Sequence, residues 1–253
     1  MKKYIVVLSL ALILFVGLSC SDQENQNKAD PTLKILPAYT IIQIADLENP
    51  DAYTEYTGAH LPAMTQYGGK FIAETHNPVK IEGNRPPGRF FLIQKWTELK
   101  SFNKWYRSGE YALIKKLQDK GFKINIGLLN SARLPAELAS INAGLPSPQA
   151  VYVIYEVLSI KDQYRYRKYF DGWLQSIKNQ KGRILARDNS IETLVGKFSA
   201  TEDFILAEWP DLDSFYAWYD SEQMKPLRQV LPEISDFNMY LINSADMRPE
   251  LVW

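Results

Sequence analysis

The pattern of apolar and polar positions occurs twice along this chain. From Ala38 onward, a β-rich run precedes a helical pattern, two further strands, a second helical pattern and a last strand. In the first copy the apolar spacing predicts helices beginning near residues 50 and 97, and strands at 39–45, 71–75, 89–96 and 122–129. The same order returns at a constant step (209 − 96 = 113) that carries Trp96 to Trp209 and Trp105 to Trp218. The chain therefore contains one βαββαβ unit in two copies.

The boundaries of the first helix are marked by local chemistry. Asn49-Pro50-Asp51 offers a capping side chain, a proline at the first helical position and an acidic group in the first turn. Tyr67-Gly68-Gly69-Lys70 ends the helix, because glycine readily adopts the left-handed conformation of a C-cap. The segment 76–88, which contains Glu82-Gly83, is predicted to be a polar connection between two strands.

A βαββαβ unit packs two helices on one face of a four-stranded antiparallel sheet, which is the ferredoxin-like arrangement. The opposite face of each predicted sheet is apolar and has to be covered. We expect an α+β fold in which the two sheets pack face to face as an intramolecular, pseudo-dimeric α+β barrel. A chain that covers its own sheets in this way has no need of a homodimer through that face, so we expect a monomer.

The pattern divides the chain into six segments. These are a signal peptide (1–19), a flexible tether (20–37), the first repeat (38–131), a linker (132–150), the second repeat (151–244) and a C-terminal tail (245–253). The linker contains three prolines, and a short helix is predicted at 135–141.

The N-terminal segment resembles a bacterial lipoprotein signal. Lys2 and Lys3 precede an apolar run at 4–18, which is shorter than the roughly 20 residues of a spanning helix, and small residues flank Cys20. The resemblance implies cleavage before Cys20, lipidation of its sulfur and a membrane-anchored place in the bacterial cell envelope. A plain secretory signal and an uncleaved anchor are the alternatives, and the pattern leaves inner membrane, outer membrane and cell surface open.

The first repeat resembles the DUF1330 family. The resemblance lies in Tyr67-Gly68-Gly69-Lys70, in Glu82-Gly83 and in the stretch 105–111 (WYRSGEY), which occur in this order. The family belongs to the dimeric α/β-barrel superfamily, so the resemblance implies the same fold as the periodicity. The second repeat departs from the pattern, since Lys181, Val195 and Met224 replace Gly68, Glu82 and Tyr111. The family carries no assigned reaction, so the resemblance implies none.

Composition excludes several classes of function. The formal net charge of zero offers no basic excess for a phosphate backbone, so no nucleic-acid partner is expected. The two histidines, His60 and His76, lie on different predicted elements, so we expect no metal site. The chain has no P-loop, dinucleotide glycine loop or G-x-S-x-G motif, and we expect no cofactor.

Candidate site residues come from the differences between the two copies. His60, Glu82, Arg85 and Tyr111 correspond to Trp173, Val195, Phe198 and Met224, so the second copy has exchanged polar groups for apolar ones. We expect a pocket between the sheet and the helices of the first repeat. Its catalytic candidates are His60 and Glu82, as a general-base pair, and its ligand-binding candidates are Tyr56, Arg85, Trp105 and Tyr111.

Each of these residues also has a purely structural interpretation. His60 can be a hydrogen-bonded core histidine, Glu82 part of a turn, Arg85 a solvated loop residue and Trp105 a core residue. Three functions stay open at this point. They are an envelope protein that binds a small, partly apolar molecule, a cofactor-independent enzyme of oxygenation or isomerisation that uses His60 and Glu82, and a non-catalytic envelope scaffold.

Overall fold

The computed structural model describes residues 36–88, 90–131, 134, 147 and 149–244. These residues lie in one compact unit that begins at Ile35. The predicted signal peptide, Cys20, the predicted helix at 135–141 and the C-terminal tail lie outside the described residues. Among the described residues, no helix has the length and apolar character needed to cross a membrane.

The two repeats have the same order of elements. The first consists of β1 (Ala38–Leu47), α1 (Pro50–Gln66), β2 (Gly69–Thr75), β3 (Val79–Gly83), β4 (Phe90–Trp96), α2 (Leu99–Tyr106), α3 (Gly109–Lys115), the 3₁₀ turn η1 (Gln118–Lys120) and β5 (Phe122–Asn130). The second consists of β6 (Val151–Ile160), α5 (Gln163–Asn179), β7 (Arg183–Asp188), β8 (Glu192–Val195), β9 (Asp203–Trp209), α6 (Leu212–Tyr219), α7 (Met224–Ile234) and β10 (Ser235–Asn243).

The predicted N-cap of the first helix is confirmed, and its counterpart in the second repeat has the same form. The side chain of Asn49 accepts a hydrogen bond from Ala52 N, and that of Asp162 accepts from Tyr164 N and Arg165 N. Each of these bonds satisfies a backbone N–H that has no partner within the helix. The second helical pattern of the first repeat is interrupted after Tyr106, and Ser108 caps the new helix by accepting from Tyr111 N.

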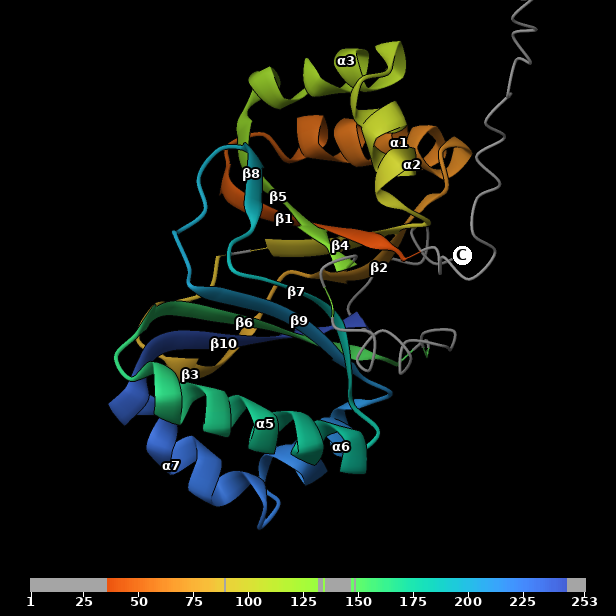
Figure 1. Cartoon of the computed structure of the whole chain (residues 1–253). Helices are drawn as coiled ribbons and strands as arrows, with labels where there is room; N and C mark the ends of the chain where they lie inside the picture. The colour runs from red at the N-terminus through yellow and green to blue at the C-terminus, as the bar shows by residue number, and fades with distance from the viewer. Residues whose placement is uncertain (1–35, 89, 132–133, 135–146, 148, 245–253) are drawn as a thin grey trace, which may run out of the picture. The chain divides into compact units, whose positions relative to one another are not determined.

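The two copies exchange one strand each (Figure 1). The strand orders are β2-β4-β1-β5-β8 and β3-β10-β6-β9-β7, so β3 of the first repeat completes the second sheet and β8 completes the first. The prediction that 76–88 is a polar connection between two strands is therefore wrong for Val79–Gly83, which form a strand of their own. This short, half-exposed strand finds its partner 155 residues away (238 − 83), and no local pattern reports such a pairing.

A glycine and an asparagine fix the end of each exchanged strand. Gly83 has a φ of +92°, and Asn238 Oδ1 accepts from Arg85 N at 3.0 Å. In the other copy Gly196 has a φ of +69°, and Asn125 Oδ1 accepts from Lys197 N at 2.9 Å. A side chain at either glycine would collide with the facing backbone and asparagine, so these are positions where only glycine fits.

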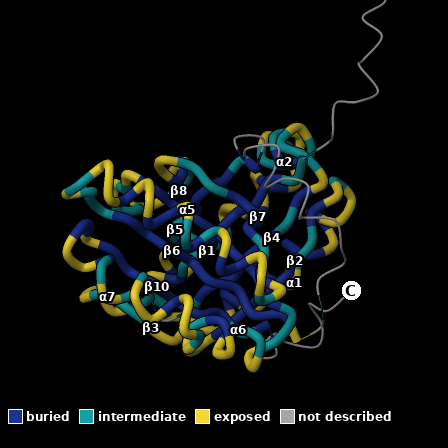
Figure 2. The backbone as a smooth tube through the Cα atoms, turned by 60° about the horizontal axis from the view of Figure 1, so that its bottom comes forward, coloured by how far each residue is buried: buried dark blue, intermediate teal, exposed yellow. Residues whose placement is uncertain are grey.

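The sheets pack face to face, as predicted. One apolar cluster joins residues of both copies, among them Tyr39, Ile41 and Ile93 of the first with Tyr152, Leu206 and Ile242 of the second. Two further clusters lie between each sheet and its own helices. Figure 2 shows the strands buried at the centre and the exposed positions at the periphery. The strands described here form two open five-stranded sheets, so the predicted barrel is not closed by hydrogen bonds.

We expect Gly83→Ala to destabilise the protein by about 1–3 kcal/mol, because it combines a left-handed backbone with a steric clash. Gly196→Ala should destabilise the protein to the same extent, because Gly196 lies at the end of the other exchanged strand, β8. Urea unfolding followed by circular dichroism measures both. Gly58→Ala is the matched control, since its position in α1 is open and helical, and it should be neutral or stabilising by up to about 1 kcal/mol. Equal stability of Gly83→Ala and the wild type would contradict the role of the exchange.

Candidate functional site

His60 lies in the middle of α1, fully buried between this helix and the first sheet. Its imidazole is surrounded by the rings of Tyr56, Phe71, Trp105 and Tyr111, with centroid distances of 5.1, 5.7, 4.8 and 6.5 Å. We call these five residues the aromatic box. Burial lowers the pKa of His60 to about 3, so the ring is neutral at physiological pH.

A chain of hydrogen bonds fixes the proton of this imidazole. Trp96 Nε1 donates to Thr40 Oγ1 at 3.2 Å, and Thr40 Oγ1 donates to Gln94 Oε1 at 2.6 Å. Because the oxygen of Gln94 is engaged in this way, its amide nitrogen faces His60 Nε2 at 2.7 Å and donates to it. His60 Nε2 is then the acceptor, and the proton of the neutral ring resides on Nδ1.

Three polar atoms of the aromatic box have no hydrogen-bond partner in the described part of the chain. They are His60 Nδ1, Trp105 Nε1 and Tyr111 Oη, and all three are buried; the amide of Gln118, which donates to Tyr56 Oη, also lies near Tyr111 Oη without forming a bond of normal geometry. The rings of Trp105 and Tyr111 are themselves in contact, with centroids 4.2 Å apart. An unsatisfied buried polar group costs about 1–3 kcal/mol, so the box holds three donors that a suitable acceptor would stabilise.

The corresponding place in the second repeat is apolar. Trp173 and Met224 stand where the box has His60 and Tyr111, and Trp218 stands where it has Trp105. The indole of Trp218 has a partner, because Trp218 Nε1 donates to Ser176 Oγ at 2.9 Å. The two indole nitrogens of Trp173 and Trp209 are unpartnered in that core, and the phenol of Tyr155, which stacks on Trp173, is bonded to the hydroxyl of Tyr169. The polar box is therefore a property of the first repeat.

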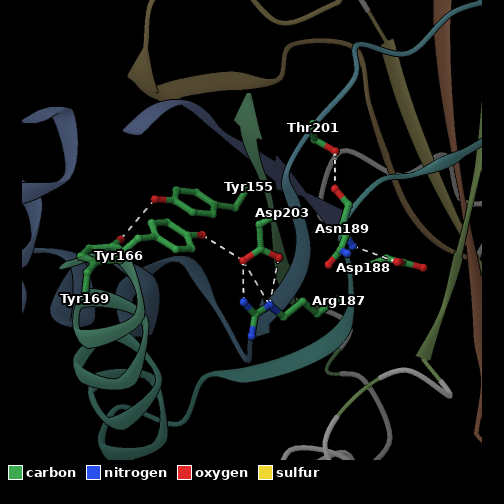
Figure 3. Close-up of polar contacts among 8 residues, drawn as sticks. All are labelled: Tyr155, Tyr166, Tyr169, Arg187, Asp188, Asn189, Thr201 and Asp203. Carbon is green, nitrogen blue, oxygen red and sulfur yellow. Dashed lines mark hydrogen bonds and ion pairs between the residues drawn. The ribbon is translucent and has the colours of Figure 1, made fainter. Parts of the chain in front are cut away.

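Polar groups elsewhere in the second repeat mostly satisfy one another (Figure 3). Arg187 Nε and Nη2 donate to the carboxylate of Asp203 at 2.7–3.1 Å, and Tyr166 Oη donates to the same carboxylate at 2.9 Å. Beside them the hydroxyls of Tyr155 and Tyr169 are bonded to each other at 3.3 Å. This network ties α5 to its sheet and has the character of a structural contact.

An outer pocket lies next to the aromatic box. It has a volume of about 270 Å³, and its lining includes Gln118 and Phe122. Gln118 Nε2 donates to Tyr56 Oη at 3.5 Å, and Phe122 packs edge-on against Tyr56 with centroids 5.2 Å apart. Tyr56 thus contacts both the lining of this pocket and His60.

Glu82 and Arg85 are not part of the aromatic box. The exchanged strand β3 carries Glu82 to the second sheet, where Tyr219 Oη donates to Glu82 Oε1 at 2.6 Å. Arg85 follows it, and its Nη1 lies 3.5 Å from Glu156 Oε2. Both residues line a different pocket of about 620 Å³, together with Lys161 and Asp236. The expectation of one pocket that contains His60, Glu82 and Arg85 is therefore wrong, and the reason is the strand exchange.

Tyr56, His60, Trp105 and Tyr111 are brought together as expected, and Phe71 and Gln94 join them. Gln94 was not recognised from the sequence, where the only signal is an amide within a largely apolar strand. Among residues 36–131 and 149–244, as far as they are described, no group of three His, Cys, Asp or Glu could hold a metal ion.

Similar proteins confirm the fold. A candidate monooxygenase from Lactobacillus acidophilus NCFM is 9% identical over 82% of this chain and 93% of its own, with a TM-score of 0.50. A candidate monooxygenase from Fusobacterium nucleatum has the same identity and TM-score over 83% and 93%. At this identity the likeness concerns the fold alone.

No curated protein sequence matches the chain. The family described as "Domain of unknown function (DUF1330)" matches it twice, at residues 37–131 and 150–245. Two matches in tandem cover most of the chain, as the internal repeat requires. The protein therefore belongs to the DUF1330 family, as a tandem duplication within one chain.

Proposed function

We propose that this protein binds a small, uncharged and partly apolar molecule in the aromatic box of the first repeat. The observation that carries the proposal is the set of three buried, unpartnered donors at His60, Trp105 and Tyr111. A ligand with a carbonyl or similar oxygen would accept from these groups, while its apolar part would pack on the rings. A charged ligand would fit poorly, because the neutral imidazole offers no counter-charge.

Binding has more support than catalysis by His60 and Glu82. A general base works best when its pKa is near the working pH, whereas His60 has a pKa of about 3. Glu82 lies in the other sheet and is engaged by Tyr219. The cofactor-independent oxygenase or isomerase thus loses both of its expected groups. The scaffold alternative gives no account of the unpartnered donors.

We propose further that the domain works as a monomer, anchored in the bacterial envelope by a lipid on Cys20. The basic start, the apolar run and the cysteine support the anchor. The polar stretch 21–30 would act as a tether between the membrane and the folded unit. The mutual coverage of the two sheets supports the monomer.

Native mass spectrometry of the full chain, purified gently from its own cells, should show a bound small molecule of uniform mass. Tyr111→Phe should weaken that binding severalfold and leave the free energy of unfolding unchanged or higher, because the lost hydroxyl has no partner. His60→Trp, which introduces the residue of the second copy, should weaken binding by about tenfold or more.

Ser176→Ala is the matched control for these variants, since it removes a polar atom at the same depth in the second repeat. It should lower stability and leave ligand affinity unchanged. Equal loss of ligand in Ser176→Ala and Tyr111→Phe, or a bare wild-type chain under all conditions, would contradict the proposal.

The neutral imidazole also predicts a pH dependence of stability. The folded-state pKa of His60 is about 3 and its ordinary value is 6.5, so the unfolded chain binds the extra proton between these values. The contribution of His60 to the free energy of unfolding is fully present above about pH 6.5. It falls by up to about 1.4 kcal/mol for each pH unit as the pH drops from 6.5 toward 3. His60→Gln should lack this contribution in urea unfolding from pH 7 to 4. His76→Gln should keep it, and identical pH slopes for wild type and His60→Gln would contradict the assignment.

Lipid anchoring predicts that the wild-type chain sediments with membranes, and that intact mass spectrometry finds fatty acids on residue 20. Cys20→Ala should appear in the soluble or the unprocessed fraction without that mass. Ser21→Ala is the control and should behave as wild type. A soluble wild-type protein with an unmodified cysteine would disprove the anchor.

A further inference from the structure

Two rows of polar residues face each other at one end of the core between the sheets. In the first sheet the cross-strand register places Lys70 opposite Lys95, and Lys95 opposite Tyr39. In the second sheet the corresponding residues are Arg183, Glu208 and Tyr152, in the same register. Tyr39 and Tyr152 belong to the apolar cluster between the sheets, so strand alternation points both rows toward that layer.

The charges of these rows do not balance. Arg183 binds both oxygens of Glu208, at 2.9 and 2.8 Å, so the single carboxylate of the two rows is already engaged. Lys70 and Lys95 lie directly opposite each other, and neither forms an ion pair with any described residue. Like charges at facing positions of a sheet are destabilising. Both lysines are half-buried, which makes their repulsion less screened by water.

Tyr39 and Tyr152, one from each row, belong to the same buried cluster, so the two rows are close. Burial lowers the pKa of Lys95, the positive charges of Lys70 and of Arg183 in the facing sheet lower it further, and the carboxylate of Glu208 opposes them. Burial also raises the pKa of Tyr39, and Glu208 of the facing sheet adds to that effect. The two rows therefore form one electrostatic cluster with an excess of positive charge.

An unpartnered hydrogen-bond donor and a pocket lie beside these charged residues. Tyr152 Oη is buried and has no hydrogen-bond partner in the described part of the chain. A pocket of about 320 Å³ opens beside Arg183 and Glu208 and is also lined by Lys181 and Trp209. Lys181 adds a further cation there, whereas Lys70, Lys95 and Tyr152 are not among the lining residues, so this pocket adjoins the second row only.

We propose that this end of the inter-sheet layer binds a small oxyanion, a carboxylate or a phosphate, between Lys70 and Lys95, with Tyr152 Oη as a further donor. The anion would relieve the repulsion of the two lysines and satisfy the buried hydroxyl through charge-assisted hydrogen bonds. This site is separate from the aromatic box and does not depend on the function proposed for it.

The test is a titration of the full-length protein in detergent with inorganic phosphate and, separately, with acetate, both at constant ionic strength. Thermal unfolding and calorimetry give the stabilisation and the affinity. At least one of the two anions should raise the unfolding midpoint more than chloride does. The anion with the larger effect identifies phosphate or carboxylate as the source of the ligand group.

Two variants separate this site from a general salt effect. Lys95→Met should raise the unfolding midpoint without anion, because it removes the repulsion, and should weaken anion affinity by about tenfold or more. Tyr152→Phe should keep the stability and weaken affinity a few-fold, whereas Tyr155→Phe, which loses a bonded hydroxyl, should keep the affinity. Lys104→Met, on the exposed face of α2, is the charge control. The proposal is wrong if Lys95→Met responds to anions as wild type does, or if neither anion exceeds chloride.

Discussion

The structure depends on one constraint: each sheet has two apolar faces and only one set of helices. The helices cover one face, and the other face has no partner but the sheet of the second copy. Burial of these faces against each other removes a large apolar area from water, which is the dominant favourable term in folding. The strand exchange adds directional hydrogen bonds to this non-directional contact, and so fixes how the two copies meet.

This constraint also explains why polar chemistry is distributed unequally. The layer between the sheets is shared, so a change in one copy has to fit the facing residues of the other. The layer between helices and sheet belongs to a single copy and can diverge independently. His60 and its unpartnered neighbours occupy that layer in the first repeat, whereas Trp173 and the Trp218–Ser176 bond fill it in the second. Divergence after duplication has thus left unpartnered polar groups around His60 in one core and mutually bonded polar groups in the other.

Sequence reasoning reached the features that local patterns encode. The step between Trp96 and Trp209 and the alternation of apolar residues were enough for the order of elements and for the packing of the sheets. The exchanged strand was missed, since Val79–Gly83 is short and half-exposed and its partner is remote in the chain. The misplacement of Glu82 and Arg85 follows directly from that omission. Gln94 was missed for a similar reason, because its role depends on the hydrogen bond to His60, which lies on another element.

The exchange of β3 and β8 changes what the covalent connection between the two repeats contributes to the fold. Each sheet borrows its outer strand from the opposite copy, so neither half of the polypeptide contains a complete sheet. In a chain broken between β5 and β6, each fragment would still supply an outer strand of the other fragment's sheet. Cohesion between the fragments would then come from the apolar layer between the sheets together with these exchanged strands.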